Sequence, residues 1–336
     1  MSKPRVEFVV GSLTRIGGVS SHVNRLLLVL TEKNIPFKVS AHKQSESKYI
    51  ELLNTTIWLL RFLFMKNDNL IHFHKSFGIL QYLYWFMFSQ FNSRRVIITI
   101  HNSSLLGYSR FKLRIALNLL RRTRFLKLIV VSDRVHALLT REKISGLHIP
   151  AYIPNVSFHR VELTAEKKLF MYSVFVGTKA NLLDIYGFDI ALRLLKKFRT
   201  EYKMLFMLGN KERSDVKYIE RTISEEGLQE DIEIIYNCNL VSYINNCEFI
   251  LRPNRQDGYG ISLQEALDQD IIAIASDVCM RPKGTITYEN FEDLVGIVSD
   301  LNVLSKDEKM KLLLKKDRVD SSAQLVEIYR ENLQTL

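Results

Sequence analysis

The sequence predicts an α/β protein made of two doubly wound units, each with a parallel sheet covered by helices. Its 336 residues are about twice the size of a common domain, so two domains of similar weight are expected. Short strand-like runs alternate with longer amphipathic runs in both halves. Runs such as LIVV at 128–131 are apolar without interruption, as expected for strands that helices cover on both faces.

The alternation defines the expected elements in order. In the first half we expect strands at 6–10, 70–74, 96–100 and 127–131, and helices at 20–31, 77–91, 110–124 and 133–142. In the second half we expect strands at 169–177, 202–209, 232–236, 247–253 and 271–276, and helices at 188–199, 215–227 and from 260. Prolines and polar residues at 148–168 predict a linker between the halves. The predicted domains are 1–155 and 156–315, followed by a C-terminal helix at 316–336 that can cross back to the N-terminal domain.

Cysteine usage and the N-terminus indicate a protein of a reducing compartment. Cys238, Cys247 and Cys279 are the only cysteines, and they show no CxxC or Cys/His metal spacing. No apolar run reaches the roughly 18 to 20 residues of a membrane-spanning helix, and the start MSKPRVEFVV does not resemble a signal peptide. We therefore expect a cytoplasmic protein without a metal or other cofactor.

The positive charge is concentrated in one half of the chain. Residues 1–150 hold 23 Lys and Arg against 7 Asp and Glu, a net charge of +16, whereas residues 151–336 hold 24 against 29, a net charge of −5. The basic half is suited to nucleic acid, anionic lipid or a phosphorylated substrate. Charge alone does not choose among these partners, but the sequence has no recognised nucleic-acid reader motif.

A glycine-containing stretch follows the first strand. Gly11 ends the strand, and Gly17 and Gly18 precede a helix whose N-terminal amides can face an anion. This stretch is either a phosphate site or simply a tight strand-to-helix turn. Its spacing is not the GxGxxG of dinucleotide-binding enzymes, which argues against a dehydrogenase.

Three histidines lie at the ends of predicted strands. Ligands of open α/β sheets gather at the carboxyl ends of strands, so His101, directly after 96–100, is placed to contact a substrate hydroxyl or phosphate. His72 lies inside its strand and is expected to be a core residue with its hydrogen bonds satisfied. For His74, contact with a ligand and a satisfied core position are equally compatible with the sequence.

The stretch RPNRQDGYGISLQEALDQD, residues 252–270, places one acid in a turn and another in the following helix. Asp257 and Glu265 are eight residues apart and can contact different parts of one extended ligand, while Gly258 and Gly260 let backbone amides approach it. A sugar nucleotide is a ligand of this kind. The alternative is a helix N-terminal acid with a surface glutamate.

In this context the sequence resembles the GT-B glycosyltransferases of family 4, which are retaining sugar-nucleotide enzymes. DGYGISLQEA corresponds to the family's E-G-F-G-x-x-x-x-E-A signature, and DQDIIAIASDV aligns with its A-C-G-x-P-V-I-A-S-D. Upstream, GGVSSHVNRLLLVL, LIHFHKS, IHNSS, IVVSDRVHALL and YIPNV match further family motifs in the same order. The resemblance covers residues 5 to about 290 and implies two Rossmann-like domains facing a central cleft.

The resemblance also implies roles for individual residues. Glu265 would hold the ribose of the nucleotide, Asp257 would meet the transferred sugar, and His101 would contact the sugar or phosphate side of the donor. Gly17 and Gly18 would border the diphosphate and admit the acceptor. No metal is implied, because basic groups and backbone amides take the charge of the leaving diphosphate. The remaining expected donor-binding residues are Gly177, Thr178, Lys179, Arg252, Arg255, Gly258, Tyr259 and Gly260.

The sequence departs from the family pattern at the diphosphate clamp. Thr178 and Tyr186 stand where the family has Arg and Lys. Lys179 is a candidate replacement, as are Arg252 and Arg255, although Lys offers a point charge where Arg offers a bidentate fork.

Three smaller departures lie in and after the acidic turn. Asp257 is one methylene shorter than the usual Glu, which bears on the sugar hydroxyl that it recognises. Asp270 and Ile272 replace a glycine and a proline at the following corner, where we expect an effect on stability.

The segment 108–127 is a candidate basic amphipathic helix. It carries seven Lys and Arg and no acid, interleaved with Phe, Leu and Ile. Such a helix can bind an anionic bilayer surface, each cation contributing about 1 kcal/mol. The alternative is a solvated helix face. The cations expected at the membrane are Arg110, Arg114, Arg121, Arg122 and Arg124.

Together, the resemblance and the charge distribution lead to one expected function and one alternative. The first is a retaining, metal-independent hexosyltransferase that moves a sugar from a UDP- or GDP-sugar to a glycan or polyprenyl-diphosphate-linked acceptor. It would work at the inner face of the plasma membrane in the synthesis of lipopolysaccharide, capsule or another cell-surface polysaccharide. The alternative is a catalytically silent homologue that binds a nucleotide sugar or partner enzyme and serves complex assembly.

Overall fold

The computed structural model of the chain divides into two compact units. Unit 1 consists of residues 1–153 and 320–336, and unit 2 of residues 154–319. The structure describes residues 5–11, 13, 18–41, 69–74, 78–92, 96–101, 104–155, 158–174, 184–209, 211, 215–314, 316–317 and 319–334.

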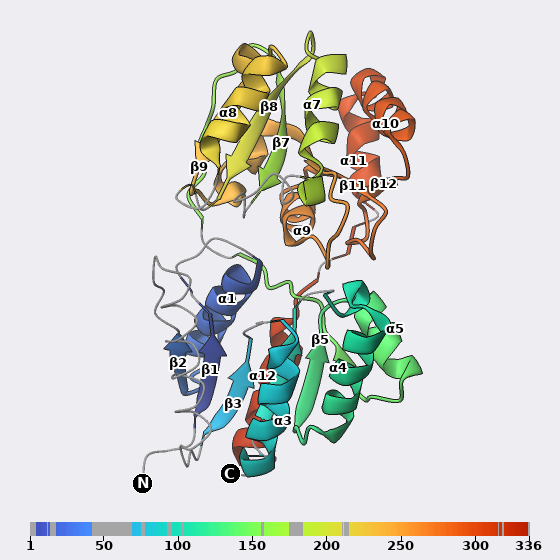
Figure 1. The fold of residues 1–336 in the computed structure, drawn as a ribbon. Helices are drawn as coiled ribbons and strands as arrows, with labels where there is room; N and C mark the ends of the chain where they lie inside the picture. Colours follow the sequence, from blue (N-terminus) through green and yellow to red (C-terminus); the bar gives the residue numbers. More distant parts are fainter. Residues whose placement is uncertain are drawn as a thin grey trace. The chain divides into compact units, whose positions relative to one another are not determined.

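Unit 1 is built on a sheet of parallel strands (Figure 1). The strands are β1 (Val6–Val10), β2 (Phe37–Ala41), β3 (Leu70–Phe73), β4 (Val96–Ile100), β5 (Lys127–Val130) and β6 (Leu147–His148), in the order β2-β1-β3-β4-β5-β6. Every residue of β1, β3 and β4 is buried, as expected for strands that helices cover on both faces, and this includes the polar residues Glu7, His72 and Thr99.

Helices cover both faces of this sheet. They are α1 (Gly18–Glu32), α3 (Leu80–Asn92), α4 (Arg110–Arg122), α5 (Asp133–Arg141) and α12 (Ser322–Gln334), and the 3-10 turn η2 (Ser104–Gly107) precedes α4. Apolar residues of α1 and α12 pack in one core cluster, and those of α3, α4 and α5 in another. Alternate residues of β1 divide between them, because Phe8 belongs to the first cluster and Val9 to the second.

The last helix of the chain belongs to unit 1. Leu325, Val326, Ile328 and Tyr329 of α12 join the core cluster that contains α1. Before the helix, the Ser321 amide donates to the Tyr152 carbonyl at 3.0 Å, and the Ser321 hydroxyl donates to the Pro150 carbonyl at 2.6 Å. The C-terminal residues thereby complete a core whose other members lie in the first 153 residues.

Unit 2 has a second sheet of parallel strands. They are β7 (Lys168–Val174), β8 (Tyr202–Leu208), β9 (Ile232–Tyr236), β10 (Cys247–Arg252), β11 (Ile272–Ser276) and β12 (Ile286–Tyr288), in the order β12-β11-β10-β7-β8-β9. Counted along the chain, this is the 3-2-1-4-5-6 order of a Rossmann sheet read from its other edge.

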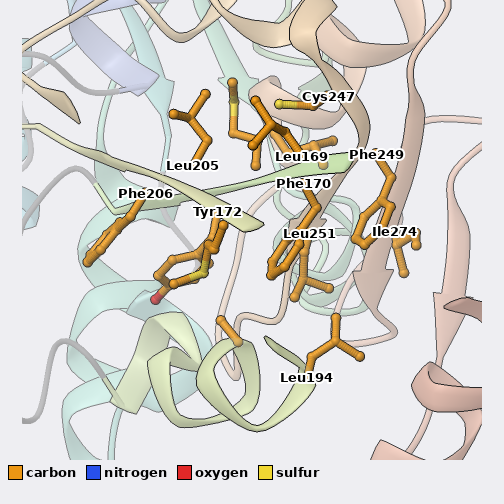
Figure 2. Packing of buried hydrophobic residues seen from close by; sticks show 14 of the residues in the cluster. Leu169, Phe170, Tyr172, Leu194, Leu205, Phe206, Cys247, Phe249, Leu251 and Ile274 are labelled. Carbon is orange, nitrogen blue, oxygen red and sulfur yellow. The ribbon is translucent and has the colours of Figure 1, made fainter. Parts of the chain in front are cut away.

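One apolar core joins this sheet to its helices. The helices are α7 (Phe188–Lys197), α8 (Val216–Glu225), α9 (Ile261–Asp268), α10 (Phe291–Val303) and α11 (Lys306–Leu313), with short 3-10 turns at η4 (Gln229–Asp231), η5 (Leu240–Ser242) and η6 (Ile244–Asn246). Figure 2 shows side chains of this core around β7, where the rings of Phe170 and Phe249 stack with centroids 5.2 Å apart. Leu194 of α7 belongs to the same core.

Local sequence signals determine where several helices begin. The side chains of Ser132 and Asp215 accept hydrogen bonds from the first turns of α5 and α8. Asn290 with Asp293, and Ser305 with Glu308, form capping boxes at α10 and α11. These caps satisfy backbone N–H groups that have no partner within the helix.

The α/β class and the two doubly wound units predicted from the sequence are confirmed. Each expected strand and helix has a counterpart, with ends that differ by a few residues. The alternation did not reveal β2, β6, β12, α10 or α11. Two of them, β6 and β12, have only two and three residues, which is too short for a period of two to be read. Within the described part of the chain, no helix is both long and apolar enough to cross a membrane.

Candidate functional site

The sheet order of unit 2 fixes where a ligand would bind. β7 and β10 are neighbours in the sheet, yet the chain leaves them toward opposite edges. Open α/β sheets bind ligands at the carboxyl ends of the strands at such a switch point. The chain leaves β10 at Arg252 and runs through residues 253–260 into α9. The predicted residues Gly177, Thr178 and Lys179 follow β7 and lie outside the described residues.

Asp257 is held between two arginines at this switch point. Arg252, the last residue of β10, donates from Nε to Asp257 Oδ2 at 2.5 Å and from Nη2 to Oδ1 at 2.9 Å. Arg281, which follows β11, donates from Nη1 to Oδ2 at 2.5 Å. All three side chains are largely buried, with exposed fractions of 8% for Asp257, 13% for Arg252 and 3% for Arg281. The arrangement is a desolvated cluster of two cations and one anion.

The cluster fixes the charge state of its members. Burial by itself would raise the pKa of Asp257, but the charges and hydrogen bonds of Arg252 and Arg281 outweigh it and hold that pKa well below its usual range. Burial would lower the pKa of Arg252, whereas the Asp257 carboxylate raises it above its usual value. Asp257 and Arg252 are therefore charged at neutral pH, and with the guanidinium of Arg281 the cluster has a net positive charge.

Arg281 also fixes the end of the neighbouring strand. Its Nε and Nη2 donate to the Ser276 carbonyl at 3.0 and 2.8 Å, at the last residue of β11. The Ser276 hydroxyl donates to the Asn254 carbonyl in the turn after β10 at 2.5 Å. These contacts join the carboxyl ends of β10 and β11 around the acidic turn.

Arg255 lies at the surface and not in the buried cluster. Its guanidinium forms a bidentate pair with Asp189 at 2.9 and 2.7 Å, and Nη1 also donates to the Asp184 carbonyl at 2.6 Å. Its side chain is 46% exposed. Arg252 and Arg255, both predicted to face the diphosphate, are thus paired with acids of the protein.

The ion pair between Arg255 and Asp189 links the turn after β10 to the start of α7. A close backbone contact joins the same two segments. Gly187, the residue before α7, has a φ of +66°, and a Cβ atom there would lie 2.1 Å from the Pro253 carbonyl oxygen. Only glycine permits both this backbone conformation and this close approach. The two loops flanking the switch point are therefore in direct backbone contact.

The glycine turn opens α9 and leads to Glu265. Gly260 has a φ of +87° just before the helix, which favours glycine. The Gly258 amide donates to Asp257 Oδ1 at 2.9 Å, and the Tyr259 hydroxyl donates to Gln264 Oε1 at 3.2 Å. Glu265 lies on the first turns of α9 and is only 4% exposed. A buried glutamate at the carboxyl edge of the sheet fits a specific polar role better than the surface position weighed as the alternative.

Asp270, which stands where the family pattern has a glycine, has a left-handed backbone conformation of the kind that favours glycine. Its φ is +59°, in the turn between α9 and β11, and its carboxylate pairs with Lys316. The Lys316 ammonium also donates to the Leu267 carbonyl at 2.7 Å near the end of α9. These contacts agree with the expected structural role of this corner.

Unit 1 gathers four histidines at the carboxyl edge of its own sheet. His74 Nδ1 lies 2.8 Å from His101 Nε2, and His74 Nε2 lies 3.2 Å from His72 Nδ1. His72 also contacts the Tyr329 hydroxyl at 2.6 Å and the Thr99 hydroxyl at 2.7 Å, which agrees with a satisfied core residue. His22 of α1 completes the group, with its ring centroid 5.3 Å from that of His101.

These imidazoles are neutral at physiological pH. Burial lowers the pKa of His72, His74 and His101 well below the usual value, and neighbouring imidazoles lower each of them further. Burial lowers the pKa of His22 to about 4, despite its hydrogen bond to the Ala151 carbonyl. Neutral imidazole can donate one hydrogen bond and accept another, so the group can contact uncharged hydroxyls.

The glycine pair before α1 is only partly described. Gly18 is the first residue of α1, whereas Gly17 lies outside the described residues. The α1 N-terminus follows β1, which borders the switch point between β1 and β3 in this sheet. Its amides are therefore at the edge where an anion would be expected.

The basic segment forms α4, as predicted, and its cations are exposed. Arg110, Arg114, Arg122 and Arg124 face solvent, and Phe111 among them is 74% exposed. Arg121 is exposed as well, but its guanidinium forms an ion pair with the Glu142 carboxylate at 2.6 Å. Ala116, Leu117 and Leu120 form the buried side of the helix.

Sequence reasoning missed Arg281 and His22 as site residues. Arg281 follows the end of the strand predicted at 271–276. His101 was selected because ligands gather at the carboxyl ends of strands, and the same reasoning could have selected Arg281. His22 lies within the matched segment GGVSSHVNRLLLVL, but its buried position next to His74 and His101 depends on how α1 packs. A pocket lined by Lys283, Gly284, Thr285, Ile286, Leu312, Leu314, Lys316 and Asp317 contains none of the predicted site residues.

The fold and the switch-point residues define a GT-B protein with two Rossmann-like units. Residues 162–327, nearly all of unit 2, match the family described as glycosyl transferases group 1. This match lies almost entirely in unit 2, and the resemblance recognised in the sequence is confirmed.

Solved structures with the same fold extend the match to the whole chain. HepE of Anabaena in complex with UDP-glucose has a TM-score of 0.71 at 12% identity and covers 99% of this chain and 100% of its own. Sucrose-phosphate synthase of Thermosynechococcus elongatus gives 0.69 at 14% identity, with 99% and 100% covered. WaaG, a glycosyltransferase involved in lipopolysaccharide biosynthesis, gives 0.64 at 11% identity, with 96% and 99% covered. A search of curated proteins found no significant match.

Proposed function

We propose that the protein is a retaining glycosyltransferase that transfers a sugar from a UDP- or GDP-sugar to a glycan or lipid-linked acceptor in cell-surface polysaccharide synthesis. The observation that carries this proposal is the acidic turn at the switch point of unit 2, where Asp257 and Glu265 lie at the carboxyl edge of a Rossmann-ordered sheet. The structures similar in fold include HepE with bound UDP-glucose, which makes a UDP-sugar the first donor to test.

The charges at the turn suit the diphosphate of such a donor. Arg252 and Arg281 outweigh the single negative charge of Asp257, so the buried cluster is positive beside the ligand edge. Leaving-group charge can be stabilised by such preorganised cations without a metal ion. We therefore propose that this cluster, with the backbone of the 257–260 turn, replaces the family's Arg/Lys clamp.

One specific observation favours the alternative of a catalytically silent homologue. The guanidinium groups of Arg252 and Arg255 already bind Asp257 and Asp189, so the donor would compete with or share these pairs. A protein that binds a nucleotide sugar or a partner enzyme without turnover would tolerate such pairing. Measuring binding and turnover separately distinguishes the two functions.

The decisive experiment is a donor screen followed by a turnover assay. Thermal unfolding with UDP, GDP and their sugars should show stabilisation by one nucleotide family, because a ligand at about 100 times its Kd adds roughly 2.7 kcal/mol. Release of the nucleoside diphosphate with a lipid-linked acceptor, undiminished in EDTA, would support a metal-independent transferase, and NMR of the product would report retention. Binding without turnover on any acceptor would favour the silent homologue, and no binding of any nucleotide would reject both.

We further propose that α4 holds the protein at an anionic membrane surface. α4 presents the exposed cations Arg110, Arg114 and Arg122 and the exposed Phe111, a combination suited to a bilayer interface. α3, which contacts α4, adds the exposed apolar residues Leu80 and Leu83. This position would suit a transferase whose acceptor carries a polyprenyl diphosphate.

A further inference from the structure

We propose that His22, His74 and His101 form a binding site for a divalent transition-metal ion of the zinc type. The three residues come from α1, from the end of β3 and from the end of β4, so the fold of unit 1 brings them together. One potential ligand atom from each of the three side chains lies within 4.8 Å of the other two. Among the described residues, no other group of three or more His, Cys, Asp or Glu side chains meets this condition.

The spacing of the rings matches that of a three-histidine metal centre. A tetrahedral ion with Zn–N bonds of about 2 Å holds its imidazole ring centres about 5 Å apart. The observed ring centroids lie 5.7 Å apart for His22 and His74, 5.3 Å for His22 and His101, and 5.1 Å for His74 and His101. Small ring rotations would therefore direct the nitrogens at one point without moving the backbone.

The hydrogen bond of His22 leaves a nitrogen lone pair for a metal, and the contacts of His74 and His101 bring two further ring nitrogens close to one another. His22 Nδ1 contacts the Ala151 carbonyl at 3.1 Å, and since a carbonyl only accepts, Nδ1 carries the proton and Nε2 carries the lone pair. His74 presents Nδ1 to His101, while its Nε2 faces His72 Nδ1 at 3.2 Å. Metal-binding histidines commonly donate their second nitrogen in this way to a carbonyl or another acceptor.

The donor set selects the class of ion. Three neutral imidazoles suit zinc, copper or nickel, whereas Mg²⁺ and Ca²⁺ require oxygen ligands. Three protein ligands leave a fourth position of a tetrahedral ion for water or another small ligand.

Binding of the ion would replace the 2.8 Å contact between His74 and His101. Since the family resemblance implies that His101 contacts the sugar or phosphate side of the donor, we expect the ion to lower donor affinity, an effect that rests on the proposed function. Metal binding itself does not rest on it.

The first test measures Zn²⁺ binding to the metal-free full-length protein by competition with a chromogenic chelator. We expect one equivalent to bind, and His22→Asn and His101→Gln each to weaken binding by more than tenfold. These substitutions keep an amide nitrogen near the position of His22 Nδ1 or His101 Nε2, which preserves local hydrogen bonds. His148→Asn is the matched control, because His148 stacks on His136 elsewhere in unit 1 and should leave binding unchanged.

Two measurements on the wild-type protein keep the proposal falsifiable if a variant unfolds. X-ray absorption should show a first shell with three imidazole nitrogens at about 2.0 to 2.1 Å, and Co²⁺ should give the visible absorption of a tetrahedral ion. Failure to bind Zn²⁺, a sulfur-containing shell, or equal binding by a folded His22→Asn protein would overturn the site.

The effect on the donor is tested separately. UDP-sugar affinity of the wild-type protein should fall at least tenfold when Zn²⁺ is bound, while that of His22→Asn should not respond. If zinc binds through the three histidines and donor affinity is unchanged, the competition is rejected. If neither a UDP-sugar nor a GDP-sugar binds, the proposed function fails while the metal site stands on its own measurement.

Discussion

Arg281 and Asp257 form a buried ion pair across 24 positions of sequence, with Nη1 donating to Oδ2 at 2.5 Å and only 3% and 8% of the two side chains exposed. The pair joins the segment after β11 to the turn after β10, at the edge where the Rossmann-ordered sheet of unit 2 would bind its ligand. Removing one partner of a buried pair leaves the other charge in a poorly solvated place.

Arg281→Gln should therefore destabilise unit 2 by about 3 kcal/mol, which lies at the low end for a broken buried pair because Arg252 still contacts Asp257. Urea unfolding followed by circular dichroism provides the measurement. Arg255→Gln is the matched control, since its pair with Asp189 is about half exposed and should contribute no more than about 1 kcal/mol. If the two variants lose the same free energy of unfolding, the Arg281 pair contributes no more to stability than an exposed ion pair.

Gly187→Ala should disturb the binding edge more than the same substitution at another left-handed glycine. A Cβ atom at Gly187 would meet the Pro253 carbonyl at 2.1 Å, whereas at Gly227, with a φ of +64°, it would meet nothing within 4 Å. Both variants carry the cost of about 1 to 2 kcal/mol for an L-residue in this conformation. Only Gly187→Ala should also weaken nucleotide binding, measured by calorimetry. Unchanged affinity in that variant would separate the α7 start from the ligand site.

Glu265→Gln should weaken binding of the bare nucleotide, even when no sugar is attached. The glutamate is assigned to the ribose, and a lost hydrogen bond to a charged group costs about 1.5 to 3 kcal/mol, or roughly a 10- to 150-fold rise in Kd. Glu292→Gln, an exposed acid in the first turn of α10, serves as the control. If the Kd for UDP or GDP does not change, Glu265 does not contact the nucleotide.

The histidine group should make unit 1 sensitive to mild acid. The pKa of His22 is about 4 in the folded protein against about 6.5 in an unfolded chain, so between these pH values the unfolded state binds more protons. Stability from His22 is thus fully present above about pH 6.5 and is lost by about 1.4 kcal/mol per pH unit as the pH falls toward 4. The lowered pKa values of His72, His74 and His101 act in the same direction.

Tryptophan fluorescence can follow this effect, because both tryptophans of the chain, Trp58 and Trp85, fall within residues 1–153. The urea midpoint should drop between pH 7.5 and 5.5 in the wild-type protein and drop less in His22→Asn. His159→Asn, an exposed histidine of unit 2, should behave as the wild-type protein does. A midpoint independent of pH over this range would contradict the buried, neutral state of the group.

The exposed cations of α4 should support binding to anionic vesicles. Replacing Arg110, Arg114 and Arg122 together by Gln removes up to about 3 kcal/mol, which lowers the partition coefficient by at most roughly two orders of magnitude. The control is Lys197, Lys217 and Lys311 to Gln, which removes the same charge from exposed positions of unit 2. Equal cosedimentation of the two triple variants at low salt would leave α4 as a solvated helix face.

The sequence by itself determined the α/β class and the order of most elements, because these depend on short-range patterns. Val96–Ile100 is apolar except for Thr99, as expected for a strand whose sheet is covered on both faces. The acidic turn was likewise visible, since Asp257, Gly260 and Glu265 lie within one strand-turn-helix segment. The strand-end rule placed His101 at the ligand edge of its sheet.

Only the tertiary structure decided which distant groups meet at these edges. Arg281 reaches Asp257 because β10 and β11 are neighbours in the sheet, and His22 reaches His74 and His101 because α1 packs over the first strands. α12 joins unit 1 because its apolar face completes the core around α1 and β1. Such contacts join residues far apart in sequence, and their formation depends on sheet order and side-chain burial, which no local pattern of residues specifies.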